Sequence, residues 1–195
     1  AFRYYFLRAI PFGSDGSFSW EDMSARYTSE LANDFGNLAS RLAAMIEKYC
    51  GGKIPAVAKD ETLAQSLQTT VDKADAAMVA LDFQGGINAV MDYCKQVNGY
   101  VTIKEPWILA KDPANQAILE EVLYNTAESL RALAVLLHPV MPATTEILWE
   151  ALGAKASLGE IGKQEISKVA TWGQLPQGAT VTKTPVLFPR LEVKE

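Results

Sequence analysis

Two polar side chains, Asn37 and Arg41, stand four residues apart in a long amphipathic segment, and Asn33 precedes them by another four. Residues with this spacing lie one turn above each other on the same face of a helix. An amide and a guanidinium held on a rigid helix present fixed hydrogen-bond donors, which can read the polar edge of a planar group such as a base. The simpler alternative is a solvated helix face that carries one buried amide.

Trp107 offers a different chemistry, because it follows Pro106 in a predicted loop between two helices. An indole in such a position either fills a gap in the core or exposes its face as a platform on which an unpaired base stacks. If the helix that carries Asn37 and Arg41 neighbours the helix that follows the loop, these three side chains share one surface.

Residues suited to other chemistry are few. The only histidine, His138, stands beside a proline at the end of a predicted helix, where a core or capping role is favoured over catalysis. Cys50 and Cys94 lie far apart, and no Cys/His cluster indicates a metal site. The sequence has no glycine-rich phosphate loop. It therefore predicts no catalytic residue and no metal ligand.

The composition is typical of a globular protein, with 49% hydrophobic and 21% charged residues in a chain of 195. The 18 Lys and Arg residues and 23 Asp and Glu residues give a net charge of −5. This balance argues against a protein that coats nucleic acid through many phosphate contacts, but it is compatible with a local base-reading surface. No apolar run reaches the ~18 residues of a membrane-spanning helix.

Hydrophobic periodicity predicts an all-α fold, a bundle of about five helices over residues 19–153. The predicted helices span residues 20–50, 61–81, 83–103, 113–138 and 142–152, after a shorter helix at residues 1–9. The N-caps expected from residue type are Ser19, Asp60, Asp82 and Asp112. The buried stripe predicted for the fourth bundle helix consists of Ile118, Val122, Leu123, Leu130, Leu133 and Leu137.

Beyond Gly153 the helical pattern gives way to glycines, prolines and short β-prone runs. One or two helical turns are expected within residues 160–170, and a strand is expected at residues 186–188. We interpret this stretch as an irregular C-terminal extension that packs on another part of the protein.

Several segments resemble the class I aminoacyl-tRNA synthetases. Residues 31–38 (LANDFGNL) and 136–149 (LLHPVMPATTEILW) are similar to two signatures of the anticodon-binding helical bundle of that class. Residues 37–41 (NLASR), 98–100 (NGY) and 105–111 (EPWILAK) resemble the methionyl-tRNA synthetase family in particular.

Both ends of the chain resemble the same family. Residues 1–8 are similar to the helix after its KMSKS loop, and residues 187–192 (LFPRLE) to its C-terminal segment. The resemblance implies that residues 1–18 are a remnant of the link to a missing catalytic domain, and that residues 154–195 pack back on the parent enzyme. The H-x-G-H and K-M-S-K-S signatures and the zinc knuckle are absent from the sequence. We therefore expect a piece of a larger enzyme that is inactive by itself.

The resemblance implies a module that reads the CAU anticodon of methionine tRNA. In the family, the Asn and Arg of the N-L-A-x-R run contact the first anticodon base, a cytosine, and the Trp of the P-W pair stacks with the anticodon. These roles fall on Asn37, Arg41 and Trp107, with Asn33 and Asn98 as candidate supporting residues.

The parent enzyme is expected to attach methionine to its tRNA with ATP and Mg²⁺, which bind in the missing catalytic domain, so that this segment holds no cofactor. We expect a cytoplasmic monomer without membrane contact, whose partners are the tRNA and, in cis, the catalytic domain. Two alternatives remain. One is the same bundle from an isoleucine, valine, leucine or cysteine enzyme, against which the pairing of Asn37 and Arg41 with Pro106 and Trp107 argues. The other is a helical protein–protein interaction domain, which the net charge of −5 supports.

Overall fold

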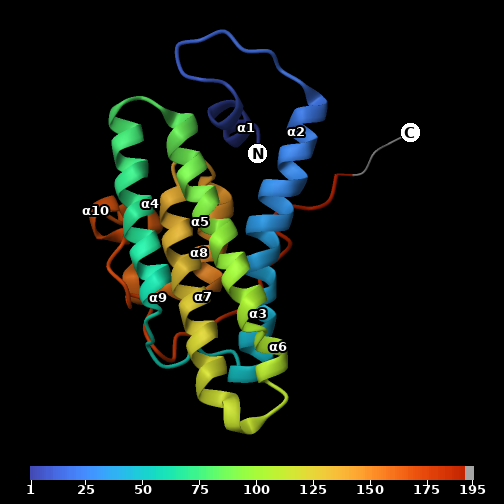
Figure 1. The fold of residues 1–195 in the computed structure, drawn as a ribbon, viewed down its shortest axis with the longest axis vertical. Coiled ribbons are helices and arrows are strands. Elements are labelled where there is room, and N and C mark those ends of the chain that lie inside the picture. Colours follow the sequence, from blue (N-terminus) through green and yellow to red (C-terminus); the bar gives the residue numbers. More distant parts are fainter. Residues whose placement is uncertain (192–195) are drawn as a thin grey trace.

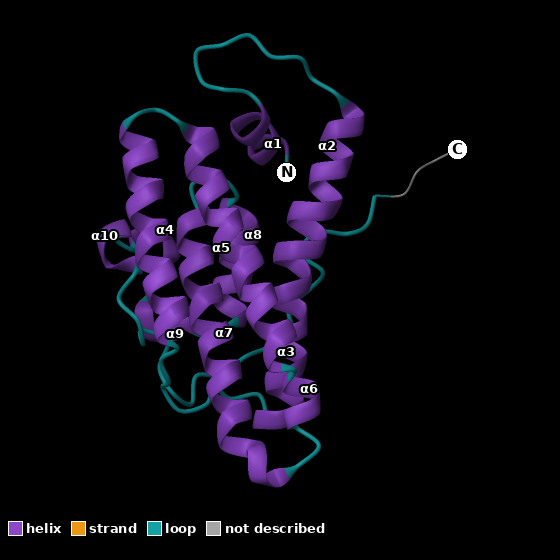
Figure 2. Ribbon diagram, viewed as in Figure 1, coloured by secondary structure: helices purple, strands orange, loops and turns teal. Residues whose placement is uncertain are grey.

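The computed structural model describes residues 1–191, and every regular element within them is a helix (Figures 1 and 2). The predicted all-α fold is therefore confirmed for this part of the chain. Lys53 and Thr180 form an isolated antiparallel β-bridge. Residues 192–195, which end the predicted extension and the LFPRLE segment, lie outside the described residues.

The helices follow the predicted order. The first element, α1 (Phe2–Ala9), lies beside the start of α5 (Phe83–Lys104), where the Gln84 amide donates to the carbonyl of Arg8 at 3.1 Å. The elements that follow are α2 (Trp20–Arg26), η1 (Tyr27–Gly36), α3 (Asn37–Cys50), α4 (Glu61–Val79), α5 (Phe83–Lys104), α6 (Pro106–Leu109), η2 (Pro113–Asn115), α7 (Gln116–Leu137), α8 (Pro142–Ala151), α9 (Ala154–Leu158), η3 (Ile161–Lys163) and α10 (Ile166–Val169). Segment η1 is π-helical, and η2 and η3 are single 3-10 turns.

Local signals set the helix boundaries as predicted. Each cap is an oxygen that accepts a hydrogen bond from a backbone N–H two or three residues on, which satisfies a donor that the first turn leaves free. The four acceptors are Ser19 Oγ and one carboxylate oxygen each of Asp60, Asp82 and Asp112, at 2.9–3.2 Å. At the other ends, α3 stops at Gly51 (φ +58°) and α8 stops before Gly153 (φ +70°), which adopt left-handed conformations open to glycine.

Residues 20–50 form one continuous helical rod, as predicted, but its middle part is π-helical instead of α-helical. At the end of η1, the N–H of Asn37 bonds to a carbonyl five residues back instead of four. Glu30 in this segment is buried. Its carboxylate accepts hydrogen bonds from the Tyr4 hydroxyl at 2.7 Å and from the Arg8 guanidinium at 3.0 Å, so that α1 is tied to η1.

Helix α7 is the central element of the bundle, because α3, α4, α5, α6, α8 and α10 all pack against it (Figure 1). Every side chain from Val122 to Val135 is buried, although the sequence predicts only a stripe. Five members of that stripe are buried, whereas the prediction for Ile118 is wrong, because its side chain is 48% exposed. A helix that is buried on all sides must also bury its polar residues, among them Glu128 and Arg131.

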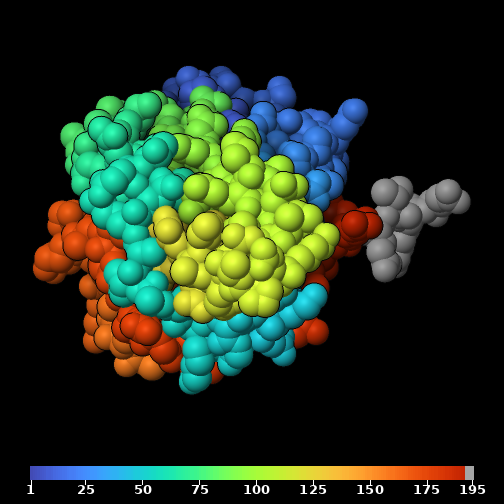
Figure 3. Space-filling view, turned by 60° about the horizontal axis from the view of Figure 1, so that its bottom comes forward, coloured from blue at the N-terminus to red at the C-terminus, as the bar shows by residue number. Residues whose placement is uncertain are grey.

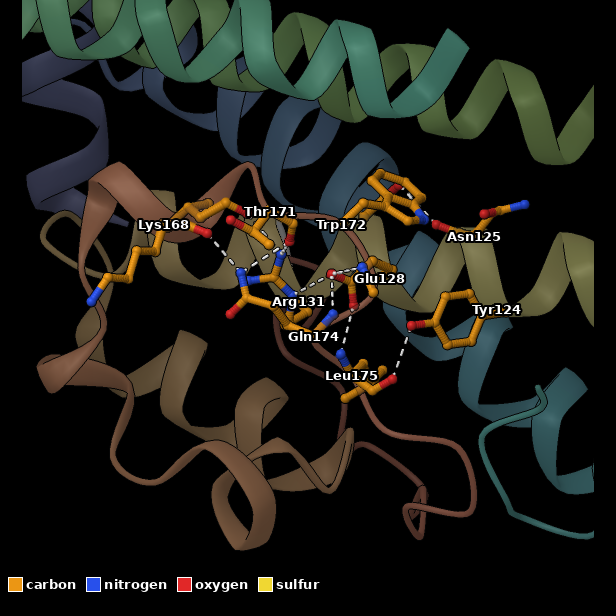
Figure 4. A network of polar contacts seen from close by, with 12 residues as sticks. Tyr124, Asn125, Glu128, Arg131, Lys168, Thr171, Trp172, Gln174 and Leu175 are labelled. Atoms are coloured by element: carbon orange, nitrogen blue, oxygen red, sulfur yellow. Dashed lines mark hydrogen bonds and ion pairs between the residues drawn. The ribbon is translucent and has the colours of Figure 1, made fainter. Parts of the chain in front are cut away.

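The buried pair of Glu128 and Arg131 fastens the C-terminal segment to α7 (Figure 4). The Nε of Arg131 donates to the Glu128 carboxylate at 2.8 Å, and its Nη2 donates to the carbonyl of Val169 at 2.8 Å. The same carboxylate accepts the backbone N–H groups of residues 173–175 at 2.9–3.2 Å. Glu128 and Glu30 are therefore buried, although acidic side chains on helix faces are usually solvated.

The C-terminal extension packs back on the bundle through buried apolar side chains, among them Ile161, Val169, Leu175, Val181 and Phe188. The predicted helical turns within residues 160–170 are present as η3 and α10. The strand expected at residues 186–188 is wrong, because this segment bends and places Phe188 beside Tyr27 and Phe35. Packing of the extension on the rest of a parent enzyme stays a prediction.

Candidate nucleic-acid interface

Arg41 and Trp107 lie together, although different helices carry them. The Arg41 guanidinium carbon lies 5.5 Å from the centre of the Trp107 ring. Arg41 is half-buried on α3, and Trp107 is 36% exposed on α6. A cation over an indole face at this distance is a favourable contact. Both side chains nevertheless remain partly exposed at the surface.

The backbone around Pro106 positions the indole. Glu105 adopts a left-handed conformation (φ +46°), which ends α5 and redirects the chain before the proline. Pro106 is buried as the first residue of α6, a position where its missing N–H leaves no helical bond unmade. Trp107 therefore stands on a short helix instead of the predicted loop, with Leu109 of the same helix packed against the core.

Asn33 and Asn37 line a surface groove of about 280 Å³ between the η1–α3 junction and the C-terminal segment. Both side chains are exposed, and neither amide has a hydrogen-bond partner within residues 1–191. Ser40 and Arg190 lie on the walls of the same groove. The sequence does not predict Arg190 as a groove residue, because its place in the groove with Asn37 depends on how the C-terminal segment folds back.

Asn98 plays a different part from the other predicted residues. Its Nδ2 donates to the backbone carbonyls of Asp34, at 3.0 Å, and Cys94, at 3.1 Å. The bond to Asp34 joins α5 to η1, whereas the bond to Cys94 lies within α5. Asn98 thus holds the segment that carries Asn33 in place, while a contact of Asn98 with RNA stays a prediction.

Charged side chains of both signs lie on η1, α3 and α5, the elements that surround the candidate residues. Burial raises the pKa of Asp34, and the charge of Glu30 raises it further, whereas Lys95 lowers it. Two more cations lie over aromatic rings, with Lys48 Nζ 5.2 Å from the Tyr49 ring and Lys104 Nζ 5.5 Å from the Tyr100 ring. These pairs stand in the last turns of α3 and α5. Cations interleaved with aromatic rings are typical of surfaces that bind single-stranded nucleic acid.

The other chemistry-bearing residues have structural surroundings. The Nδ1 of half-buried His138 and the Thr145 hydroxyl are 2.9 Å apart at the corner between α7 and α8, and a structural role of His138 stays a prediction. Burial raises the pKa of both thiols, to about 12 for Cys94, which keeps them protonated at neutral pH. Within residues 1–191, no three His, Cys, Asp or Glu side chains gather closely enough to hold a metal ion. In the same part of the chain, the helices are too short or too polar to cross a membrane.

Comparison with known proteins gives two family matches. Residues 60–180 match the anticodon-binding domain of tRNA ligase, and residues 1–43 match the class I (M) tRNA synthetases. The first match covers more than half of the chain and continues past residue 153, where the sequence analysis ends the bundle.

Similar proteins come from several bacteria. The chain is 59% identical to a methionine–tRNA ligase of Streptomyces coelicolor, over all of this chain and 37% of that protein. It is 42% identical to the methionine–tRNA ligase of Halalkalibacterium halodurans, over all of this chain and 30% of that protein. The chain therefore spans about a third of the length of these relatives.

Two solved structures of Mycobacterium tuberculosis methionyl-tRNA synthetase are similar to the fold. The apo form aligns with a TM-score of 0.85 and 29% identity, over 98% of this chain and 38% of that one. The complex with methionyl-adenylate aligns with a TM-score of 0.81 and 30% identity, over 97% of this chain and 37% of that one. The chain therefore belongs to the anticodon-binding domain family of the tRNA ligases, as the anticodon-binding portion of a methionyl-tRNA synthetase.

Proposed function

We propose that this chain reads the CAU anticodon of methionine tRNA through Asn37, Arg41 and Trp107. The observation that carries the proposal is the placement of the Arg41 guanidinium 5.5 Å from the partly exposed Trp107 ring. Asn37 supports it, because its exposed amide lies one helical turn from Arg41. Stacking surface and hydrogen-bond donors therefore stand within reach of one unpaired base.

The chemistry of cytosine suits these groups. Its pairing edge carries two acceptors, N3 and O2, and the guanidinium and amide are donors, so Arg41 and Asn37 bind that edge while the indole face of Trp107 stacks. Asn33 widens the polar surface along the groove, and Asn98 holds η1 in register behind it. Uracil presents an N–H where cytosine has the N3 acceptor, which sets the basis for discrimination.

The activity of the whole enzyme is part of the same proposal. The parent attaches methionine to its tRNA, with ATP and Mg²⁺ bound outside residues 1–195 in a catalytic domain that acts in cis. We propose that the parent is a cytoplasmic monomer. The chain alone should support no methionine-dependent ATP–pyrophosphate exchange. Robust exchange by a pure sample would refute the proposal that ATP binds outside residues 1–195.

Titration of the chain with tRNAs that differ only in the anticodon tests the proposal. We expect methionine tRNA to bind more tightly than the same tRNA with a changed first anticodon base. Preference for an isoleucine, valine, leucine or cysteine anticodon would contradict recognition of CAU and would favour the anticodon specificity of another class I enzyme. The absence of tRNA binding at low salt would favour the interaction-domain alternative.

A further inference from the structure

An apolar pocket of about 170 Å³ lies where α4, α5, the end of α7 and α10 meet. Helix α10 packs on both α4 and α7, and its first residue, Ile166, lines the pocket. Figure 3 shows the orange segment that contains α10 against the turquoise and green surface of α4. One wall of the pocket therefore forms only when the C-terminal extension folds back on the bundle.

The walls of the pocket are suited to a small apolar group. Five of the side chains that line it are buried members of the core: Ala74, Ile87, Val90, Leu137 and Val140. Met78 and Ile166 are partly exposed and stand at its edge. An apolar cavity of about 150 Å³ holds a benzene molecule. The space is therefore large enough for one six-membered ring or for a branched chain of similar size.

Gly86 and Met78 shape the edge of the pocket. A Cβ atom at Gly86 would lie 2.8 Å from Cε of Met78, closer than such atoms approach each other. The missing side chain on α5 therefore leaves room for the end of the Met78 side chain of α4. A methionine side chain is flexible, and its sulfur makes favourable contacts with aromatic rings. Met78 can thus move aside for a ligand and then pack against it.

Asp75 is the charged residue of the pocket, because the other residues that line it are apolar or glycine. Its exposed carboxylate makes no hydrogen bond or ion pair within residues 1–191. The Arg3 guanidinium donates to the carbonyl of Pro139 at 3.3 Å, but Arg3 does not line the pocket. An apolar space with one carboxylate at its edge favours a ligand that carries a positive charge.

We propose that this pocket binds a small apolar amine, which consists of one aromatic ring or one branched chain and a single ammonium group. The apolar part fills the space beside Met78, and the ammonium group donates to the Asp75 carboxylate. The volume limits the occupant to one small molecule, and the charge of Asp75 disfavours an anion. The inference does not rest on tRNA recognition, because Arg41 and Trp107 lie on α3 and α6, outside this pocket.

The first test locates the ligand, with benzylamine as the probe. The methyl groups of the five methionines, labelled with ¹³C, report its position in an NMR titration. We expect a saturable shift of the Met78 methyl signal and no shift for Met23 or Met45, which do not line the pocket. The proposal is wrong if the Met78 signal does not respond, or if all these signals shift in proportion to the concentration of benzylamine.

Two substitutions on α4 test whether the pocket itself is the site. Ala74→Leu places a larger side chain in the pocket and should abolish the saturable shift. Ala76→Leu makes the same change at an exposed position that does not line the pocket, and it should bind benzylamine as the wild type does. If Ala74→Leu does not fold, Ile166→Phe takes its place, because Ile166 is partly exposed at the edge. Binding that survives in the filled variant would overturn the proposal.

The second test concerns the charge. Asp75→Asn should weaken binding of benzylamine about two- to fivefold, the range expected for a partly solvated ion pair. The same variant should leave binding of benzyl alcohol unchanged. Asp72→Asn is the matched control, because Asp72 is also exposed on α4 but does not line the pocket. If the wild type binds benzyl alcohol as tightly as benzylamine, or if Asp75→Asn affects both probes equally, selectivity for an amine is refuted.

Discussion

The guanidinium of Arg41 covers part of the Trp107 indole at 5.5 Å, a contact that joins α3 to α6 and defines the candidate anticodon surface. Because the ring remains 36% exposed, an incoming base can stack on it beside the cation. The contact also fixes the guanidinium before RNA arrives, which reduces the side-chain entropy lost on binding.

Trp107→Ala should weaken binding of methionine tRNA by roughly 1–3 kcal/mol, the value of a lost base stack. Its effect on the free energy of unfolding should be smaller than the ~3–5 kcal/mol of a core tryptophan. Filter binding and urea unfolding measure the two quantities. Trp20→Ala is the matched control, because Trp20 is 66% exposed near the other end of the bundle and should not alter tRNA binding.

Arg41→Ala and Asn37→Ala should reduce discrimination at the first anticodon base by about 1–3 kcal/mol each, by analogy with bidentate base contacts. The measurement compares CAU with a changed first base across a salt series. If Arg41→Ala instead lowers both affinities by one factor and reduces the salt slope by about one, Arg41 is a phosphate anchor. Base reading would then depend on Asn37 and Trp107.

Glu128→Gln should destabilise the fold by roughly 3–5 kcal/mol, because it leaves the buried guanidinium of Arg131 without its counter-charge. Urea unfolding at neutral pH measures the change. Lys168→Ala removes an exposed ion pair with Glu165 and should change the free energy of unfolding by less than about 1 kcal/mol. Similar losses for both variants would contradict a special role of the buried pair.

Stability should fall at alkaline pH because of buried tyrosines. Burial raises the pKa of Tyr4, Tyr93 and Tyr124 above the ordinary value of about 10, and that of Tyr100 to about 12. A folded pKa above the unfolded one gives stability that is complete below about pH 10 and is lost as the unfolded phenols ionise. Urea midpoints between pH 8 and 11 should decline only above about pH 10. A spectrophotometric titration in which all seven tyrosines ionise near their ordinary pKa without unfolding would contradict this.

The helices were predictable because their signals are local. Ser19, Asp60 and Asp82 cap the turns that follow them in sequence, so that residue type and position suffice. The π-helical winding of η1 escaped prediction, because apolar residues spaced by four suit both helix types. Within this segment, Glu30 also makes contacts that are remote in sequence, because Tyr4 and Arg8 of α1 bind its carboxylate.

The candidate site was only partly predictable. Spacing placed Asn33, Asn37 and Arg41 on one face, but the 5.5 Å contact of Arg41 with Trp107 depends on how α3 and α6 meet on α7. Arg190 joins the groove only because the chain folds back over a long sequence distance. Interactions of this range leave no periodic trace in a sequence.

The fastening of residues 173–175 to Glu128 also bears on the order in which the chain folds. The hydrogen bonds span 45–47 residues, so α7 is synthesised before the residues that bind its Glu128. Until they arrive, Glu128 and Arg131 favour water over the bundle interior. Closure of the core around α7 must therefore wait for the C-terminal segment, and a chain cut before residue 173 should stall as a loosely packed intermediate.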